Sequence, residues 1–251
     1  MDLSIVNQHH RDVNIIFDEE PHVYYINGLA NNISVTTFIH SLFPSFDSDK
    51  IIEKMMKSRN WKNSKYYGKT IEEIKNDWET NRIEASKAGT EMHKIIELFY
   101  NDNQIYNSSL EFKYFKKFND EHNELEPYRT EWIVYDEEVK LAGSIDMLYK
   151  KKNGDDTNLI MYDWKRSKKI NYENQFENGF EPIKHIPNSN YWHYSLQLNI
   201  YKKIIEKNYG KIIDEMYLLI LHPDNCNYIK IKVPNLENEV NNLFQFRKTL
   251  L

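Results

Sequence analysis

The stretches KLAGSIDMLYKK, residues 140–151, and NLIMYDWKRS, residues 158–167, decide the fold predicted for this chain. Both are apolar runs of strand length, and the polar turn Asn153-Gly154-Asp155 lies between them, as is typical of a β-hairpin. The segment TEWIVYD, residues 130–136, comes before them and has the same extended character. We therefore expect three consecutive strands in an antiparallel meander.

The side-chain period of a strand is two, and it groups the charged residues of these strands. Asp163 and Lys165 must emerge on one face of their strand, and Ser144 and Asp146 on one face of the preceding strand. Hairpin pairing can then set Asp146 beside Asp163. Two neighbouring carboxylates repel each other unless a cation sits between them, so the pattern predicts a divalent-metal site.

Lys165 adds a positive charge next to the predicted metal site. An ammonium group there can position a water, help to deprotonate it, or offset the charge that develops on phosphorus during phosphodiester hydrolysis. In isolation an Asp-x-Lys triplet is usually a solvated ion pair. The hypothesis of a catalytic site therefore depends on the other residues that accompany the triplet along the chain.

The segments before the meander predict a short hairpin and several helices. Asn27-Gly28 indicates a tight turn, and Thr36 or Thr37 marks the start of a helix. Thr70 and Glu73 form a capping-box pattern that predicts a helix over 70–78. A longer helix is expected from Arg82 to Tyr100, because apolar residues recur there at three- and four-residue spacings, and another within 109–124.

The segments after the meander predict a helix, two strands and a final helix. The apolar stripe of residues 191–208 indicates the first helix, and Gly210 is placed to end it. MYLLILHP and YIKIKVP follow as strands, the second with the alternation of a half-exposed edge strand. The whole predicts a mixed α/β fold, divided into an N-terminal hairpin and helical extension over 1–80 and a core over 81–251.

Four short motifs occur in a fixed order: GTEMHKIIE from Gly89, LAGSIDML from Leu141, YDWKRS from Tyr162 and SLQLNIYK from Ser195. This set resembles the RecB-type and lambda-exonuclease-like branch of the PD-(D/E)XK nucleases. There, a helix with G-x-x-x-H precedes a G-x-x-D strand, a (D/E)-x-K strand and a Q-x-x-x-Y helix. HVYYING and SVTTFI, near the N-terminus, look like the openings of viral, phage and mitochondrial genome-maintenance exonucleases.

The resemblance implies a restriction-endonuclease-like core, with a mixed central sheet flanked by helices, and a role for each matching residue. Asp146 and Asp163 would bind Mg²⁺ or Mn²⁺, Lys165 would organise the water, and Asp163 is shorter than the more usual Glu. The remaining implied residues are the metal ligands His93 and the Trp164 carbonyl, the acidic Glu131 with Glu97 as competitor, and the substrate-binding Gln197, Tyr201, Ser167, Lys168 and Ser144.

Each of these residues also has a simpler interpretation. His93 is compatible with a satisfied core or surface histidine, and Glu97 with a solvated helix residue. Tyr201 is compatible with plain packing, because its neighbours Ile200 and Ile204 are apolar. Lys168 belongs to a short Lys run that is compatible with a solvated surface.

Composition limits the cofactors and the setting. Cys226 is the only cysteine, so one chain cannot form an internal disulfide or a cysteine-ligated iron–sulfur cluster. No apolar run reaches membrane-spanning length and no targeting peptide is evident, so we expect an intracellular, reducing compartment, with cytoplasm, nucleus and viral factory left open. The net charge of −5 means that a nucleic-acid partner would require local clusters of Lys and Arg.

The sequence therefore predicts a metal-dependent deoxyribonuclease, with an exonuclease of replication, recombination or repair as the leading form. No helicase motif is present, so any unwinding would come from a partner such as a helicase or a single-strand-binding protein. Two alternatives stay open: an endonuclease with the same core, structure-specific or RNA-cutting, and a non-catalytic DNA-binding scaffold. Strand preference, cleavage polarity and oligomeric state are not predicted.

Overall fold

The computed structural model describes residues 2–21, 23–102, 105–152 and 154–251, and the chain divides into two compact units. One unit comprises Met1–Pro44 and Met92–Leu251, and the other comprises Ser45–Glu91. All described strands belong to the larger unit. The domain division expected at residue 80 remains a prediction. No helix of the described segments is both long and apolar enough to cross a bilayer.

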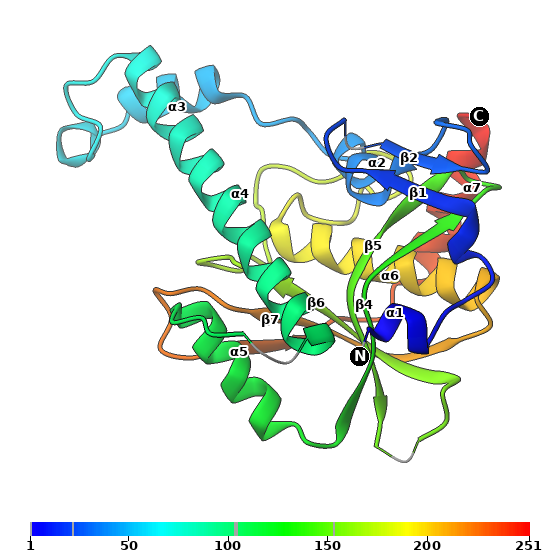
Figure 1. Cartoon of the computed structure of the whole chain (residues 1–251). Coiled ribbons are helices and arrows are strands. Elements are labelled where there is room, and N and C mark those ends of the chain that lie inside the picture. The colour runs from blue at the N-terminus through cyan, green and yellow to red at the C-terminus, as the bar shows by residue number, and fades with distance from the viewer. Residues whose placement is uncertain (1, 22, 103–104, 153) are drawn as a thin grey trace. The chain divides into compact units, whose positions relative to one another are not determined.

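The larger unit is built on a six-stranded mixed sheet (Figure 1). Its path runs β3-β5-β6-β7-β8, and β4 also pairs with β5. β4, β5 and β6 pair antiparallel, β6 and β7 pair parallel, and β8 is an edge strand. The strands are β3 (Ile33–Ser34), β4 (Leu125–Asp136), β5 (Leu141–Lys151), β6 (Asn158–Lys165), β7 (Ile212–Ile220) and β8 (Ile229–Lys232). The predicted meander is confirmed, although Asn153 lies outside the described residues.

Alternation along the strands gives this sheet two buried faces. In β6, Leu159 and Met161 belong to one apolar cluster, whereas Ile160, Tyr162 and Trp164 belong to another. Both faces are covered, which explains why the strand is apolar almost throughout. Asp163 and Lys165 continue the series of Leu159 and Met161, so the strand period assigns them to that face.

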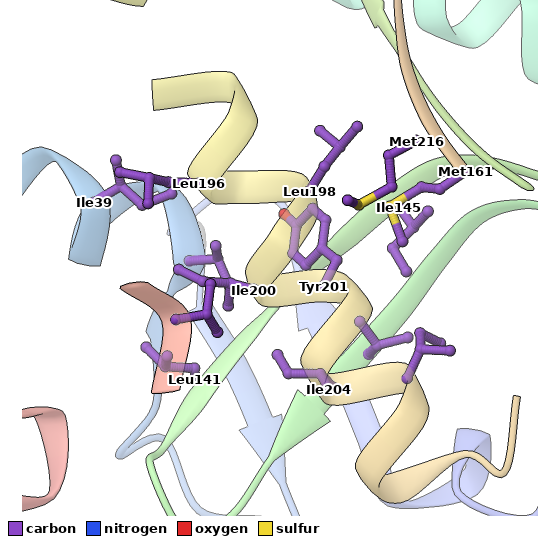
Figure 2. Packing of buried hydrophobic residues seen from close by; sticks show 14 of the residues in the cluster. Ile39, Leu141, Ile145, Met161, Leu196, Leu198, Ile200, Tyr201, Ile204 and Met216 are labelled. Atoms are coloured by element: carbon purple, nitrogen blue, oxygen red, sulfur yellow. The ribbon is translucent and has the colours of Figure 1, made fainter. Parts of the chain in front are cut away.

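Helices cover both faces of the sheet (Figure 1). α6 (Asn190–Asn208) packs on the face of Met161, and Figure 2 shows its Leu198 and Tyr201 beside Ile145 and Met161. α5 (Leu110–Glu121) packs on the opposite face through three buried phenylalanines. The larger unit also contains α1 (Leu3–Val6), α2 (Val35–Ser41) and α7 (Glu237–Thr249). The mixed α/β fold, consistent with a restriction-endonuclease-like core, is therefore confirmed.

One helix replaces the two that the sequence predicts over 70–78 and 82–100. α4 runs without interruption from Ile71 to Asp102 and begins in the smaller unit, which also contains α3 (Ser48–Met56). The capping box is confirmed: the Glu73 amide donates to Thr70 Oγ1, and the Thr70 amide donates to a Glu73 carboxylate oxygen at 2.7 Å. The polar residues between the predicted helices are compatible with an exposed helix and do not end it.

The start of the helix near Thr36 differs from the prediction by two or three residues. Ser34 is the cap of α2, because its hydroxyl accepts a hydrogen bond from the Thr37 amide at 3.0 Å. Asn27 and Gly28 form the predicted tight turn, with mutual backbone bonds between Ile26 and Leu29. The longer hairpin pairs β1 (Ile15–Asp18) with β2 (Val23–Ile26) and was not predicted.

Candidate metal centre

Two acidic side chains, Asp146 and Asp163, lie on the neighbouring strands β5 and β6. The last pair in the register of β5 and β6 is Met147 with Tyr162, and Asp146 and Asp163 are the next residues of the two strands, near enough for Asp163 to raise the pKa of Asp146. Both carboxylates are buried. Asp146 Oδ2 accepts a hydrogen bond from the Trp164 amide at 2.7 Å, which fixes its carboxylate against β6.

His93 joins this pair from the part of α4 that belongs to the larger unit. Its Nε2 lies 3.0 Å from the carbonyl oxygen of Trp164. Its Nδ1 lies 3.5 Å from a carboxylate oxygen of Asp146 and 3.5 Å from one of Glu131. The imidazole is therefore placed among two carboxylates and one backbone carbonyl.

Glu131 reaches the same place from β4 through an unusual backbone conformation. Its φ is +42°, in the left-handed region, although its neighbours Thr130 and Trp132 pair regularly with β5. A non-glycine residue held there costs on the order of 1–2 kcal/mol, and such strain clusters at functional sites. The Ser144 hydroxyl donates to Glu131 Oε2 at 2.9 Å and so orients the carboxylate.

His93, Glu131 and Asp146 form a compact set of ligand atoms. One donor atom from each lies within 4.8 Å of the others, and no other such set occurs among the described residues. Two carboxylate oxygens and one imidazole nitrogen are donors that suit Mn²⁺, and the oxygens also suit Mg²⁺. The donor set therefore fits the predicted divalent metal. Its residues come from α4, β4 and β5.

Burial and mutual repulsion shift the ionisation of this set. Burial above all raises the pKa of Asp146 to about 7; His93 opposes this shift, and Asp163 and Glu131 add to it. Burial lowers the pKa of His93, but Asp146 and Glu131 outweigh it and raise that pKa to about 9. Buried negative charge in this arrangement favours a positive partner.

Lys165 is held beside the set by Asp163 and an aromatic ring. Its Nζ lies 2.6 Å from Asp163 Oδ2 and 4.8 Å from the centre of the Tyr194 ring. Burial lowers the pKa of Lys165, yet Asp163 and Asp146 outweigh it, so the pKa is raised overall. The ammonium is therefore protonated at neutral pH, and Asp163 is its direct partner.

Gln197 and Tyr201 are buried on α6, behind the carboxylates. Gln197 Nε2 donates to the Tyr201 hydroxyl at 3.3 Å. The ring of Tyr201 packs on Gly143, where an added Cβ would lie 2.5 Å from the Tyr201 oxygen. This contact explains why a glycine stands three residues before Asp146. A substrate-binding role for Gln197 and Tyr201 remains a prediction.

The other predicted residues lie at different distances from the set. Glu97 follows His93 by one helical turn; burial and then Glu131 raise its pKa, but it is outside the compact donor set. Ser167 donates to the Lys169 carbonyl, and the exposed Lys168 pairs with Asp224 at 2.6 Å. Phosphate contacts for Ser167 and Lys168 remain predictions, and so does a substrate contact for Ser144, whose hydroxyl donates to Glu131.

Two tyrosines near the set were not predicted. The Lys165 ammonium lies over the ring of Tyr194. Tyr194 shares a face of α6 with Gln197 and Tyr201, so its three-residue spacing from Gln197 could have indicated that it lies near the site. Tyr24 comes from β2; burial raises its pKa to about 12, and nearby Glu131 adds to the shift. Nothing local in the sequence connects Tyr24 with a carboxylate more than a hundred residues away.

Comparison with known proteins gives distant structural likeness only. No protein-family model matches the chain, and no curated protein matches it. The crystal structure of SSO0001 superposes with a TM-score of 0.33 and 15% identity, over 99% of this chain and 81% of that one. A candidate exonuclease from Eubacterium rectale gives a TM-score of 0.34 and 11% identity, over 87% and 78% of the chains. Values this low do not assign a family.

Proposed function

We propose that this chain is a divalent-metal-dependent nuclease that hydrolyses DNA phosphodiester bonds, acting as an exonuclease in replication, recombination or repair. The observation that carries the proposal is the convergence of His93, Glu131 and Asp146 beside Lys165. Structural ion pairs do not need three ligand groups from three elements around one point. A strained Glu131 in that group further favours a functional role.

Three groups would hold the metal: His93 through Nδ1, Glu131 and Asp146, with Asp163 close to Asp146. The Trp164 carbonyl lies on the Nε2 side of the imidazole, and its predicted metal contact stays a prediction. A bound Mg²⁺ or Mn²⁺ would supply Lewis acidity, which lowers the pKa of water so that its deprotonated form can attack phosphorus near neutral pH. The Trp164 amide keeps the Asp146 carboxylate in place, and Ser144 keeps Glu131 in place. These hydrogen bonds fix the donors before a cation arrives.

Lys165 would act by electrostatics. Its raised pKa keeps the ammonium charged, so it suits stabilisation of negative charge on the phosphoryl oxygens better than proton abstraction. Asp163 and Tyr194 fix the position of Nζ. Asp163 is therefore proposed mainly as the positioning partner of Lys165, with metal contact as a second role.

The test is cleavage of end-labelled linear DNA and of covalently closed circular DNA with Mg²⁺, Mn²⁺ or EDTA. We expect the wild-type chain to digest the linear form only and to be inactive in EDTA. Cleavage of the closed circle would favour the endonuclease alternative, and DNA binding without cleavage would favour the scaffold alternative.

Variants in the same assay test the residues. Asp146→Asn, Asp163→Ala and Lys165→Ala should each lower the cleavage rate by on the order of 100-fold or more, since each removes charge at the reacting phosphate. Asp214→Asn, on an exposed carboxylate of β7, serves as the matched control. Circular dichroism checks that each variant is folded. Wild-type rates in folded Asp163→Ala or Lys165→Ala would end the proposal.

A further inference from the structure

Within the smaller unit, Ser45–Glu91, positive charge is concentrated in one segment, residues 54–69. Residues 54–69 contain six of the 33 Lys and Arg residues and no Asp or Glu. The remaining sequence therefore has 27 basic against 38 acidic residues. A polyanion is repelled by the chain as a whole and attracted by this segment.

Three cations of the segment are exposed and form no ion pair with the described residues. Arg59, Lys62 and Lys65 have no carboxylate within ion-pair distance among the described residues, and Lys65 Nζ lies 4.8 Å from the ring centre of Tyr66. By contrast, Lys57 pairs with Glu53 within α3. Unpaired cations are free to exchange their counterions for phosphates.

Aromatic rings are interleaved with these cations and contribute little to a core. Ile52 and Ile74 are the fully buried apolar residues described in this unit. Tyr67 is 55% exposed and Phe46 is 71% exposed. Trp61 contacts Tyr67 edge-on, with ring centres 5.9 Å apart.

An open hollow of about 500 Å³ lies in the same unit. Trp78 is on its wall and contacts the Phe46 ring, with centres 5.8 Å apart. Lys75 and Arg82 add two further cations to the lining, although each pairs with a carboxylate. Exposed rings beside a hollow offer surfaces on which flat bases can stack.

We propose that Ser45–Glu91 is a binding surface for single-stranded nucleic acid, with Arg59, Lys62 and Lys65 on the phosphates and Tyr67 and Phe46 stacking on bases. The inference rests on the proposed function, since a nuclease must hold the strand that it cuts. A single strand is favoured because the bases of a duplex are stacked on each other and cannot offer their faces to exposed rings.

The test measures, by fluorescence anisotropy, how tightly the full chain binds a fluorescein-labelled oligo(dT) of thirty nucleotides in EDTA. Arg59→Glu/Lys62→Glu/Lys65→Glu should weaken binding at least 30-fold. Lost contacts with three phosphates should also reduce the slope of log affinity against log salt by about 2. The control triple Lys113→Glu/Lys151→Glu/Lys152→Glu makes the same charge change at exposed positions of the larger unit and should stay within threefold of wild type.

Tyr67→Ala tests the stacking contribution separately. Removal of one stacking ring should weaken oligo(dT) binding about tenfold and leave the salt slope unchanged. Duplex DNA of equal length should compete poorly. Equal losses in both triple variants, wild-type affinity in the Arg59 triple, or equal competition by duplex would each overturn the inference.

Failure of the nuclease proposal would be visible separately. Cleavage with Mn²⁺ and oligo(dT) binding in EDTA are therefore measured on the same preparation of the wild-type chain. A wild-type chain that binds oligo(dT) through this surface but cleaves nothing would refute the proposed function alone. A chain that cleaves but binds independently of Arg59, Lys62 and Lys65 would refute only this inference.

Discussion

Asp146 shows how one residue can be poorly suited to stability and well suited to binding a cation. It is buried next to two other acidic residues, and its pKa near 7 reflects that burial. Breaking a buried ionic arrangement is usually destabilising, but removing one of several like charges relieves repulsion. The site is therefore expected to gain stability when positive charge is added or negative charge is removed.

Thermal unfolding with and without Mn²⁺ measures the stability that a cation adds at Asp146. The wild-type chain should gain several degrees in Tm at saturating Mn²⁺, because a ligand at a hundred times its Kd contributes about 2.7 kcal/mol. Asp146→Asn should keep or raise the Tm in EDTA and lose most of the metal response. Asp156→Asn, on an exposed carboxylate, is the control that should retain the response. An unchanged response in Asp146→Asn would contradict the assigned ligand.

At the scale of elements, the close approach of α6 to β5 depends on Gly143. A Cβ at this position would lie 2.5 Å from the Tyr201 oxygen and 2.8 Å from a carbon of its ring. Tyr201 cannot easily move, because it is buried and bonded to Gln197. Because Gly143 has no side chain, α6 can pack closely on β5, the strand that carries Asp146.

Gly143→Ala should therefore destabilise the chain by roughly 1–3 kcal/mol, as overpacking of a core does. Urea denaturation measures the change. Gly89→Ala is the matched control, since nothing lies within 4 Å of its added Cβ and alanine favours a helix. In a Tyr201→Phe background the loss should shrink, because the nearest oxygen is gone. A loss independent of Tyr201 would show that the clash is not its cause.

At the scale of the whole molecule, His193 makes stability depend on pH. Burial lowers the pKa of His193 to about 4, and the nearby His40 adds to this shift. The ring packs 4.2 Å from that of Phe43, and Nε2 lies 3.0 Å from Asn188 Oδ1. The fold prefers the neutral imidazole, so its contribution is complete above pH 6.5 and is lost as pH falls from 6.5 towards 4.

Free energies of unfolding at pH 7.5 and pH 4.5 test this. The wild-type chain should lose free energy of unfolding between pH 7.5 and pH 4.5, and about 1–2 kcal/mol of that loss should be absent in His193→Gln. His185→Gln, at an exposed histidine, should behave like the wild type. The same pH dependence in His193→Gln and wild type would contradict the assignment.

Local sequence determined most of the elements and part of the site. The alternation in YDWKR and the turn after residue 151 were enough to predict the meander and to expect Asp146 near Asp163, because a strand period and a hairpin register are set by nearby residues. The capping box at Thr70 was recognisable for the same reason.

Tertiary structure alone decided which distant groups complete the site. The sequence left Glu131 and Glu97 as competitors, and the structure groups Glu131 with His93 and Asp146. It also joined two predicted helices into α4 and brought Tyr24 near Glu131. Such contacts depend on loop closure and side-chain packing across the whole chain, and no local pattern of residues encodes them.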